Sequence, residues 1–341
     1  MTILLAVIMI GILVFAHELG HFLAAKASGI MVLDFAIGMG PVLLSRQVGE
    51  TRYSLRLLPI GGFARMAGEE VDEANNLIPD DRRYDKKPLL ARALVSIAGP
   101  ATNFLLAILV FSLVFMFMGV PSDQPIVGTL SAGWPAEQAG MAVGDRIISI
   151  DGAPVASWSD VQQEIAKLGG QSATMMLERS GEQISLQIVP RKDESTGQVM
   201  IGIGPKNDRF SFFGSLRMGW RETVWFTEQI ISILTNMVTG KIPAEGAGPI
   251  GMIVMVGQVA RTGVINLLTF AAIISIQLGL FNLLPIPALD GSRLVFFAIE
   301  AIRGKPVDPE KESFVHFIGF VLLMVFMVLI TFKDLQRLNI F

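Results

Sequence analysis

Residues 3–25 read ILLAVIMIGILVFAHELGHFLAA, and Glu18 is the only charged side chain among them. A helix needs about 20 apolar residues to cross a bilayer, so this stretch predicts a membrane-spanning helix. His17, Glu18 and His21 interrupt its second half, and such side chains are costly at membrane depth unless they serve a function. The stretch therefore predicts a membrane protein with a polar site inside the bilayer.

The overall composition supports a membrane protein. The chain has 341 residues, of which 52% are hydrophobic and only 17% are charged, whereas a soluble protein carries about 25% charged residues. A net charge of −3 provides no basic surface, so we expect no nucleic-acid partner. The absence of cysteine excludes a disulfide-stapled domain, a thiol nucleophile and a thiolate zinc ligand.

Three further stretches without charge have the length of a membrane span. They cover residues 93–122, 262–289 and 313–332, which are 30, 28 and 20 residues long. The uncharged stretch 246–260 has only 15 residues, so we expect it to be interfacial or re-entrant. The sequence thus predicts a membrane α-helical fold with four transmembrane helices, near residues 3–25, 94–118, 264–288 and 314–332.

The positions of lysine and arginine predict the orientation. Loop 26–93 has ten of them and loop 291–313 has four, while none precedes the first helix. Cytoplasmic loops are enriched in these residues, and long translocated segments such as 119–262 do not count reliably. We therefore expect both loops to be cytoplasmic, and both termini and residues 119–262 to be extracytoplasmic.

Residues 123–205 have the character of a small soluble domain. Short β-rich runs near 126–130, 144–152, 173–179, 183–189 and 199–203 alternate with turn residues, and a helix is predicted over 159–168. The run from Gly133 to Met141, followed by Gly144 and Asp145, resembles the PDZ family in its protease-associated form. That resemblance implies a site where an extended peptide adds a strand to a sheet edge. A generic small β-domain is the alternative.

Residues 206–262 are interpreted as an amphipathic linker. Within it, residues 210–238 mix aromatic side chains with arginines and glutamates. This pattern is typical of an amphipathic helix at the membrane surface. Packing against the PDZ-like domain is the alternative.

The sequence His17-Glu18-Leu19-Gly20-His21 matches the pattern H-E-x-x-H. On a helix, His17 and His21 lie one turn apart and face the same way, so both imidazoles can reach one zinc ion. Glu18 lies close to the same site and can take a proton from zinc-bound water. A chance match inside a membrane span is disfavoured, because these side chains are costly there.

A hydrolytic zinc site needs a third protein ligand and one open position. The chain offers His316 in the fourth span and Asp290 at the end of the third. Pro285 and Pro287 precede Asp290 and break the helix, which favours Asp290 as a carboxylate facing a cavity. A helix-capping role for Asp290 is the alternative, while His316 is interpreted as a packed or interfacial histidine.

The ordered motifs of the whole chain resemble the site-2 protease family of intramembrane zinc metalloproteases, in its bacterial form that carries PDZ domains. The motifs, besides the PDZ-like domain, are HELGH at 17–21, LPIGGF at 58–63, AGPATN at 98–103, GPIG at 248–251 and NLLPIPALDG at 282–291. The resemblance implies that His17, His21 and Asp290 bind Zn²⁺, that Glu18 is the catalytic base, and that Asn282 helps to hold the substrate.

The resemblance also implies the domain organisation. Residues 1–120 and 263–341 would form the two halves of a membrane protease core, with a cytoplasmic β-hairpin in loop 26–93 and one PDZ domain between the second and third helices. Family members commonly read Asp-Gly-Gly where this chain has Asp290-Gly291-Ser292, which leaves the ligand intact. Many Gram-negative members have two PDZ domains, and here one is visible.

The substrate-binding predictions extend around this site. Strands around Gly61 and Gly62 could clamp an unwound substrate, with a simple cytoplasmic hairpin as the alternative. Asn103 is a candidate polar partner of the substrate or a helix-packing residue. The full predicted set is Gly61, Gly62, Asn103, Asn282, Pro285 and Pro287.

The predicted function is cleavage of single-pass transmembrane proteins in the bacterial cell membrane, such as anti-sigma factors or remnant signal peptides. A peptide or a substrate ectodomain would contact the PDZ domain. One rival is an inactive membrane PDZ scaffold with a structural metal site, which would not need Glu18. The other is a metal transporter, which would need polar residues in several spans.

Overall fold

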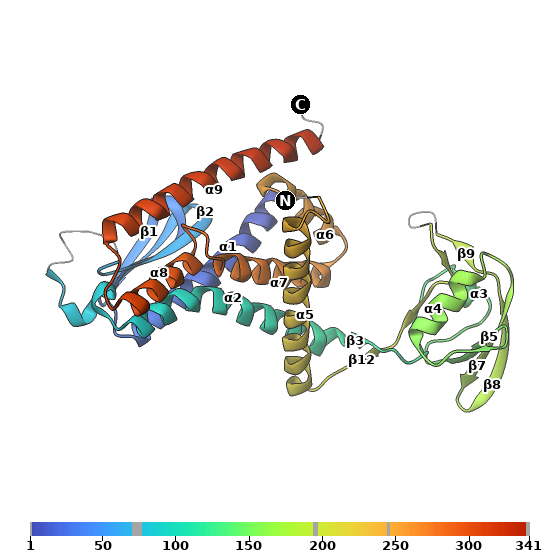
Figure 1. The fold of residues 1–341 in the computed structure, drawn as a ribbon. Helices are drawn as coiled ribbons and strands as arrows, with labels where there is room; N and C mark the ends of the chain where they lie inside the picture. The colour runs from blue at the N-terminus through green and yellow to red at the C-terminus, as the bar shows by residue number, and fades with distance from the viewer. Residues whose placement is uncertain (1, 70–76, 194–196, 244–245, 339–341) are drawn as a thin grey trace. The chain divides into compact units, whose positions relative to one another are not determined.

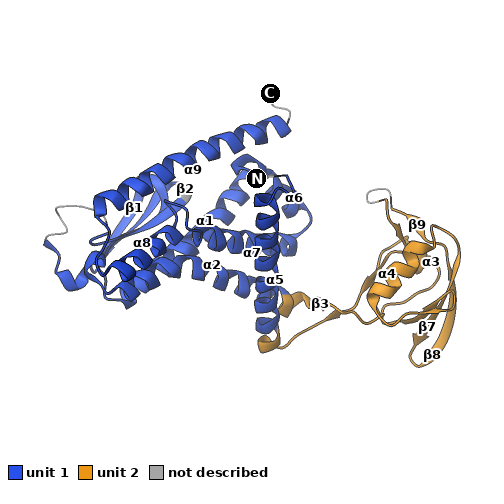
Figure 2. Cartoon of the chain, viewed as in Figure 1, with its two compact units in different colours: residues 1–114, 215–341 blue, residues 115–214 orange. Residues whose placement is uncertain are grey.

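The computed structural model describes residues 2–69, 77–193, 197–243 and 246–338. The chain forms two compact units (Figure 2). Unit 1 comprises Met1–Val114 and Ser215–Phe341, and unit 2 comprises Phe115–Gly214. The predicted PDZ-like range 123–205 lies inside unit 2.

Unit 1 is mainly helical (Figure 1). Four of its described helices, α1, α2, α7 and α9, are long and apolar enough to cross a membrane by length and composition. They lie where the uncharged stretches predict spans. The helices with residues in unit 1 are α1 (Thr2–Ala27), α2 (Leu89–Met118), α5 (Phe212–Val238), α6 (Pro249–Arg261), α7 (Val264–Asn282), α8 (Asp290–Arg303) and α9 (Pro309–Arg337).

The third predicted span, 264–288, is too long. α7 ends at Asn282, and an irregular segment leads to α8, which begins at Asp290. Pro285 and Pro287 explain the interruption, because proline lacks the backbone N–H that continues a helix. The predicted loop 291–313 in fact contains most of α8 and the start of α9.

Glycines bring α1 and α2 into close contact. A Cβ added at Gly20 would lie 2.3 Å from the carbonyl oxygen of Ala98, and one at Gly99 would lie 2.2 Å from Nε2 of His21. Small residues let helix backbones approach closely in membrane proteins. The AGPATN motif is therefore packed directly against the helix that carries the histidines.

Between α1 and α2, β1 (Val32–Val48) and β2 (Thr51–Met66) form an antiparallel sheet. Residues 34–37 of β1 pair on one side with 52–55 and on the other with 62–65, so the two strands fold back on themselves. Gly38 and Gly61 permit these bends with φ angles of +87° and +82°. The sequence predicted a β-hairpin in this loop, with strands around Gly61 and Gly62, and the pair β1–β2 lies there. Two short 3₁₀ turns, Asp80–Arg82 and Tyr84–Lys86, follow the sheet.

The predicted linker 206–262 contains two packed helices. α5 lies against α2, where the rings of Phe226 and Phe111 stack with centroids 5.6 Å apart. α6 packs against α1 through Val256, which is buried with Ala6 and Met9. From Ser215 onward the stretch belongs to unit 1.

Unit 2 is a small α+β unit. A four-stranded sheet has the order β6-β5-β7-β8, and α4 covers its buried cluster with Trp158, Val161 and Ile165. The strands predicted near 126–130, 144–152, 173–179 and 183–189 and the helix predicted over 159–168 are confirmed within one or two residues. The strand predicted near 199–203 is instead two short strands, β10 (Val199–Met200) and β11 (Ile203–Pro205), which pair with different partners. Its elements are β3 (Val120–Pro121), β4 (Val127–Leu130), α3 (Pro135–Gln138), β5 (Arg146–Ile150), β6 (Ala153–Pro154), α4 (Trp158–Lys167), β7 (Ala173–Arg179), β8 (Glu182–Ile188), β9 (Arg191–Lys192), β10 (Val199–Met200), β11 (Ile203–Pro205) and β12 (Asn207–Asp208).

Candidate active site

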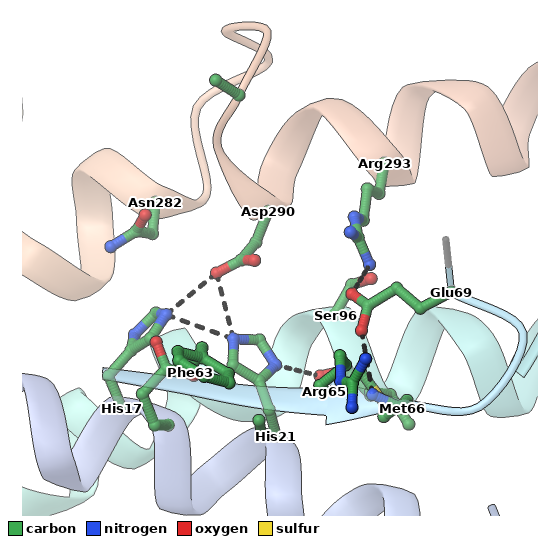
Figure 3. Close-up of a pocket in the computed structure, with 14 residues that line it drawn as sticks. His17, His21, Phe63, Arg65, Met66, Glu69, Ser96, Asn282, Asp290 and Arg293 are labelled. Carbon is green, nitrogen blue, oxygen red and sulfur yellow. Dashed lines mark hydrogen bonds and ion pairs between the residues drawn. The ribbon is translucent and has the colours of Figure 1, made fainter. Parts of the chain in front are cut away.

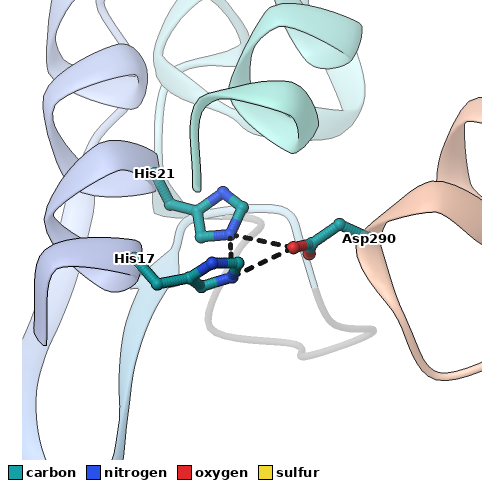
Figure 4. A group of neighbouring side chains, drawn as sticks. All are labelled: His17, His21 and Asp290. Carbon is teal, nitrogen blue, oxygen red and sulfur yellow. Dashed lines mark hydrogen bonds and ion pairs between the residues drawn. The ribbon is translucent and has the colours of Figure 1, made fainter. Parts of the chain in front are cut away.

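Three potential metal ligands converge in unit 1 (Figure 4). His17 and His21 project from one face of α1, and Asp290 projects toward them from the start of α8. Oδ2 of Asp290 lies 3.1 Å from Nε2 of His17 and 3.3 Å from Nε2 of His21, and the two Nε2 atoms are 3.2 Å apart. Among the described residues these three form the group that could hold a metal ion.

The geometry of this group fits zinc. Tetrahedral zinc holds nitrogen and oxygen ligands at about 2.0–2.1 Å, which places neighbouring ligand atoms about 3.3 Å apart. All three separations in the structure are within 0.3 Å of that value. Two imidazoles and one carboxylate leave a fourth position for water or substrate, as in catalytic zinc sites.

A buried oxygen of Asp290 also suits a metal ligand. Oδ2 of Asp290 has no hydrogen-bond partner among the described residues. A buried polar atom of this kind normally has a partner, and a metal ion held between the three side chains would supply one.

α2 orients both histidines from behind. Nδ1 of His21 donates to the carbonyl of Val95 at 2.8 Å, so its Nε2 is left to face Asp290. Nδ1 of His17 lies 3.0 Å from Nδ2 of Asn103. Asn103 is fully buried, and the Ser275 hydroxyl donates to the backbone carbonyl of Asn103. Asn103 thus contacts a histidine, and its predicted contact with substrate stays a prediction beside the packing alternative.

A cavity of about 570 Å³ opens beside the three ligands. Figure 3 shows His17 and His21 on one wall, with Asp290 and Arg293 reaching in from α8. The segment of β2 that follows Gly62 forms another wall. The lining residues are His17, Glu18, His21, Phe63, Ala64, Arg65, Met66, Glu69, Val95, Ser96, Asn282, Ala288, Asp290 and Arg293.

Glu18 and Asn282 line this cavity as the sequence predicts. Gly62 is close to Glu18, since a Cβ at Gly62 would lie 3.3 Å from Cγ of Glu18 and 2.8 Å from the carbonyl of Ala36. Nδ2 of Asn282 donates to the carbonyl of Leu278 at 2.9 Å. The side chain of Asn282 is therefore fixed at the cavity wall.

The remaining predicted substrate-binding residues do not line the cavity. Gly61 and Gly62 shape β2 just before the lining segment, and their substrate role stays a prediction. Pro287 packs on α9, where a Cβ at Gly319 would lie 2.4 Å from its carbonyl oxygen. Pro285 is exposed.

Sequence reasoning missed several polar groups of the cavity. Arg293 donates from Nη1 to Oε1 of Glu69 at 2.7 Å, and Glu69 in turn accepts from the N–H of Met66 at 3.3 Å. Ser96 and Arg65 add further polar groups. Arg293 lies three residues after Asp290, so it shares a helix face with Asp290. Recognising Asp290 as the first residue of a helix would have revealed it.

Comparisons with known proteins point in one direction. Residues 5–326 match peptidase family M50. The chain is similar to the zinc metalloprotease RasP of Geobacillus kaustophilus, with 35% identity over 98% of each chain. It is similar to the regulator of sigma-W protease RasP of Bacillus subtilis, with 33% identity over 99% of each chain.

The solved structures add little. The PDZ domain of an SdrC-like protein from Listeria monocytogenes covers 25% of this chain and 90% of that chain, with 22% identity and a TM-score of 0.22. This likeness is too slight to assign the fold of unit 2.

Proposed function

The chain belongs to peptidase family M50 and is a zinc metalloprotease of the membrane, and we propose that it cuts transmembrane segments of single-pass membrane proteins. The observation that carries this proposal is the convergence of His17, His21 and Asp290 beside a cavity that Glu18 also lines. The cavity lies between helices long and apolar enough to cross a bilayer.

In the proposed mechanism, His17, His21 and Asp290 hold the zinc ion. Bound zinc would polarise the scissile carbonyl and lower the pKa of water to about 7. Glu18 takes the proton from the attacking water and passes it to the leaving amine as the peptide bond breaks. The buried Asn103 and the carbonyl of Val95 keep both imidazoles aimed at the ion.

The substrate must be unwound before it is cut, because a helix shields its peptide bonds. The edge segment of β2, residues 62–66, runs along the cavity and pairs on one side with β1. Among the described residues no strand pairs with its other side. We propose that an unwound substrate adds there as an extended strand, which satisfies its backbone hydrogen bonds.

The proposed physiological substrate class is based on a relative. The Bacillus subtilis protein carries the name regulator of sigma-W protease RasP. We propose that this chain likewise cuts membrane-bound anti-sigma factors, with remnant signal peptides as a second class.

The proposed location is the bacterial cell membrane. The loops 26–93 and 291–313 would be cytoplasmic, since they carry ten and four basic residues. Both termini and unit 2 would be extracytoplasmic. Unit 2 would act there as a PDZ-like domain that binds a peptide or excludes substrates with an intact ectodomain.

Glu18→Gln tests the chemistry. The zinc ligands are untouched, so we expect unchanged zinc binding and a loss of cleavage of about 10²–10⁴-fold. The assay is cleavage of a tagged single-span peptide by the detergent-purified full chain, with and without a zinc chelator. Glu228→Gln, at an exposed position of α5, is the matched control and should behave as the unmodified protein. Cleavage retained by Glu18→Gln would refute the mechanism.

A further inference from the structure

The third histidine of the chain lies outside the zinc cluster but contacts the segment that leads into it. His316 projects from α9 toward the loop between α7 and α8. Its Nδ1 accepts a hydrogen bond from the backbone N–H of Ala288 at 3.1 Å. Ala288 lies two residues before Asp290 and lines the same cavity.

Ala288 has an unusual backbone conformation. Its φ angle is +77°, in the left-handed region that residues with a Cβ adopt at a cost. Such a conformation persists only where the surrounding structure holds it. The hydrogen bond to His316 helps to hold the backbone at Ala288, and with it the direction in which the chain enters α8.

Other contacts place His316 firmly against this loop. Its ring lies against Phe296 of α8, with centroids 5.7 Å apart. One turn further along α9, the backbone at Gly319 lies so close to the loop that an added Cβ would be 2.4 Å from the carbonyl oxygen of Pro287. α9 therefore contacts both the loop before Asp290 and the helix after it.

The chain on the other side of Asp290 is held by different contacts. Arg293 donates to Glu69 at 2.7 Å, and Arg92 of α2 donates to Glu300 at 2.5 Å. These ion pairs fix α8 once it has begun. They do not set the backbone angles of Ala288. Those angles are held by a local turn, in which the N–H of Leu289 donates to the carbonyl of Ile286 at 3.1 Å, together with the contacts to α9.

We propose that His316 is a positioning residue for the zinc site, which fixes Asp290 over His17 and His21 by holding the backbone of Ala288. The inference rests on the zinc site of the proposed function. It assigns His316 a role through its Nδ1 acceptor, without any contact between His316 and the metal or the substrate.

Two substitutions of His316 by side chains of similar size test whether its Nδ1 matters as a hydrogen-bond acceptor. In His316→Asn, the side-chain oxygen occupies nearly the place of Nδ1 and can accept the same hydrogen bond, whereas His316→Leu offers no acceptor. The zinc affinity of the detergent-purified full chain is measured by competition with a chelator. We expect a loss of about 10–100-fold in His316→Leu, as for other groups that orient a ligand, and about threefold or less in His316→Asn.

Thr331→Val is the matched control on the same helix. It removes a hydrogen bond of 2.7 Å to the carbonyl of Met327, far along the sequence from the loop, and should leave zinc affinity unchanged. Zinc affinity unchanged in His316→Leu would overturn the inference. So would an equal loss in His316→Asn and His316→Leu, which would assign the effect to packing of the ring. If the unmodified chain bound no zinc, the proposed function itself would fail.

Discussion

Units 1 and 2 bury opposite kinds of side chain. In unit 2 the buried cluster is apolar, and β7 alternates buried Ala173, Met175 and Leu177 with exposed or half-exposed residues. In unit 1 the apolar side chains of α9 face outward, while His17 and Asn103 are buried inside. The two units of the chain therefore differ in which side chains they bury and which they expose.

The difference is explained by two solvents. Unit 2 hides apolar surface from water, so its strands show the alternation of a sheet with one wet face. The outward apolar side chains of unit 1 suit lipid, which offers no hydrogen bonds, so every polar group inside must find a partner. The buried histidines have theirs in Val95, Asn103 and Asp290. Four predictions test whether the two units are packed for different solvents.

The largest expected effect is in the core of unit 2. Leu177 is fully buried, so Leu177→Ala leaves a cavity and should lower the free energy of unfolding of unit 2 by about 2–5 kcal/mol. Hydrogen exchange of the unit 2 strands in the full chain measures this. Val143→Ala, at a residue 63% exposed, should change little. Equal effects of the two would contradict an apolar core in unit 2.

A charge on an exposed valine should distinguish the two solvents directly. Val325 of α9 and Val189 of unit 2 are 53% and 56% exposed. Val325→Arg should cost about 2.5–3.5 kcal/mol, because it places a charge near the middle of a span. Val189→Arg should change stability by about 0.5 kcal/mol or less.

The measurement for this pair is the fraction of full-length protein integrated into membranes, together with its thermal unfolding in detergent. If Val325→Arg integrates as well as Val189→Arg, the outward face of α9 does not contact lipid.

A smaller effect is expected at the contact between α1 and α2. A Cβ at Gly99 would lie 2.2 Å from Nε2 of His21, so Gly99→Ala should displace the imidazole and weaken zinc binding by about 10–100-fold. Gly246 has open space around it, and Gly246→Ala should bind zinc normally. Chelator competition compares them. Normal zinc binding by Gly99→Ala would show that the two helices can separate freely at the site.

The smallest effect is a pH dependence in unit 2. Two hydrogen bonds from Arg179 lower the pKa of Asp145, with burial acting against them and the N–H of Ala142 adding to them. The unfolded chain has the higher pKa, about 3.9. The stabilisation is therefore complete above that value and is lost as the pH falls toward the lowered folded value.

The unfolding temperature of unit 2 in the full chain, followed from pH 6 to about pH 3, checks this sign. Asp145→Asn lacks the titrating group, so its unfolding temperature should be lower than that of the unmodified chain by an amount that shrinks as the pH falls. A difference in unfolding temperature that stays constant would show that the ion pair adds no pH-dependent stability.

Much of unit 2 could be predicted because its signals are local. Alternating apolar residues and turn glycines mark β4, β5, β7 and β8, and the residues before Trp158 mark the start of α4, where Ser157 and Asp160 form a capping box. In unit 1 the sequence predicted a β-hairpin within loop 26–93, and β1 and β2 form an antiparallel pair there. The pairing of residues 34–37 with two separate segments of β2 was not predicted, because that register depends on contacts between residues far apart in the sequence.

In the candidate site, too, the residues with a local sequence signal could be predicted and the others could not. His17 and His21 were found because a helix places residues four apart on one face. Asp290 came from the family resemblance and from the prolines before it. Arg293 was missed because Asp290 was not recognised as the start of a helix, and Glu69 carries no signal because its partner Arg293 lies in a distant segment. Asn103 was selected from the sequence, but its contact with His17 could not be predicted.

The amino-acid sequence was enough to predict a membrane protein, to locate its four long apolar helices approximately, and to place His17 and His21 on one helix face. These properties depend on composition and on neighbours within a few residues, together with helix geometry. The distances that bring Asp290 to both histidines, the contact of Asn103 with His17, and the hydrogen bond between His316 and the loop before α8 were found only in the folded chain. Those contacts join distant segments, and packing between helices sets their distances.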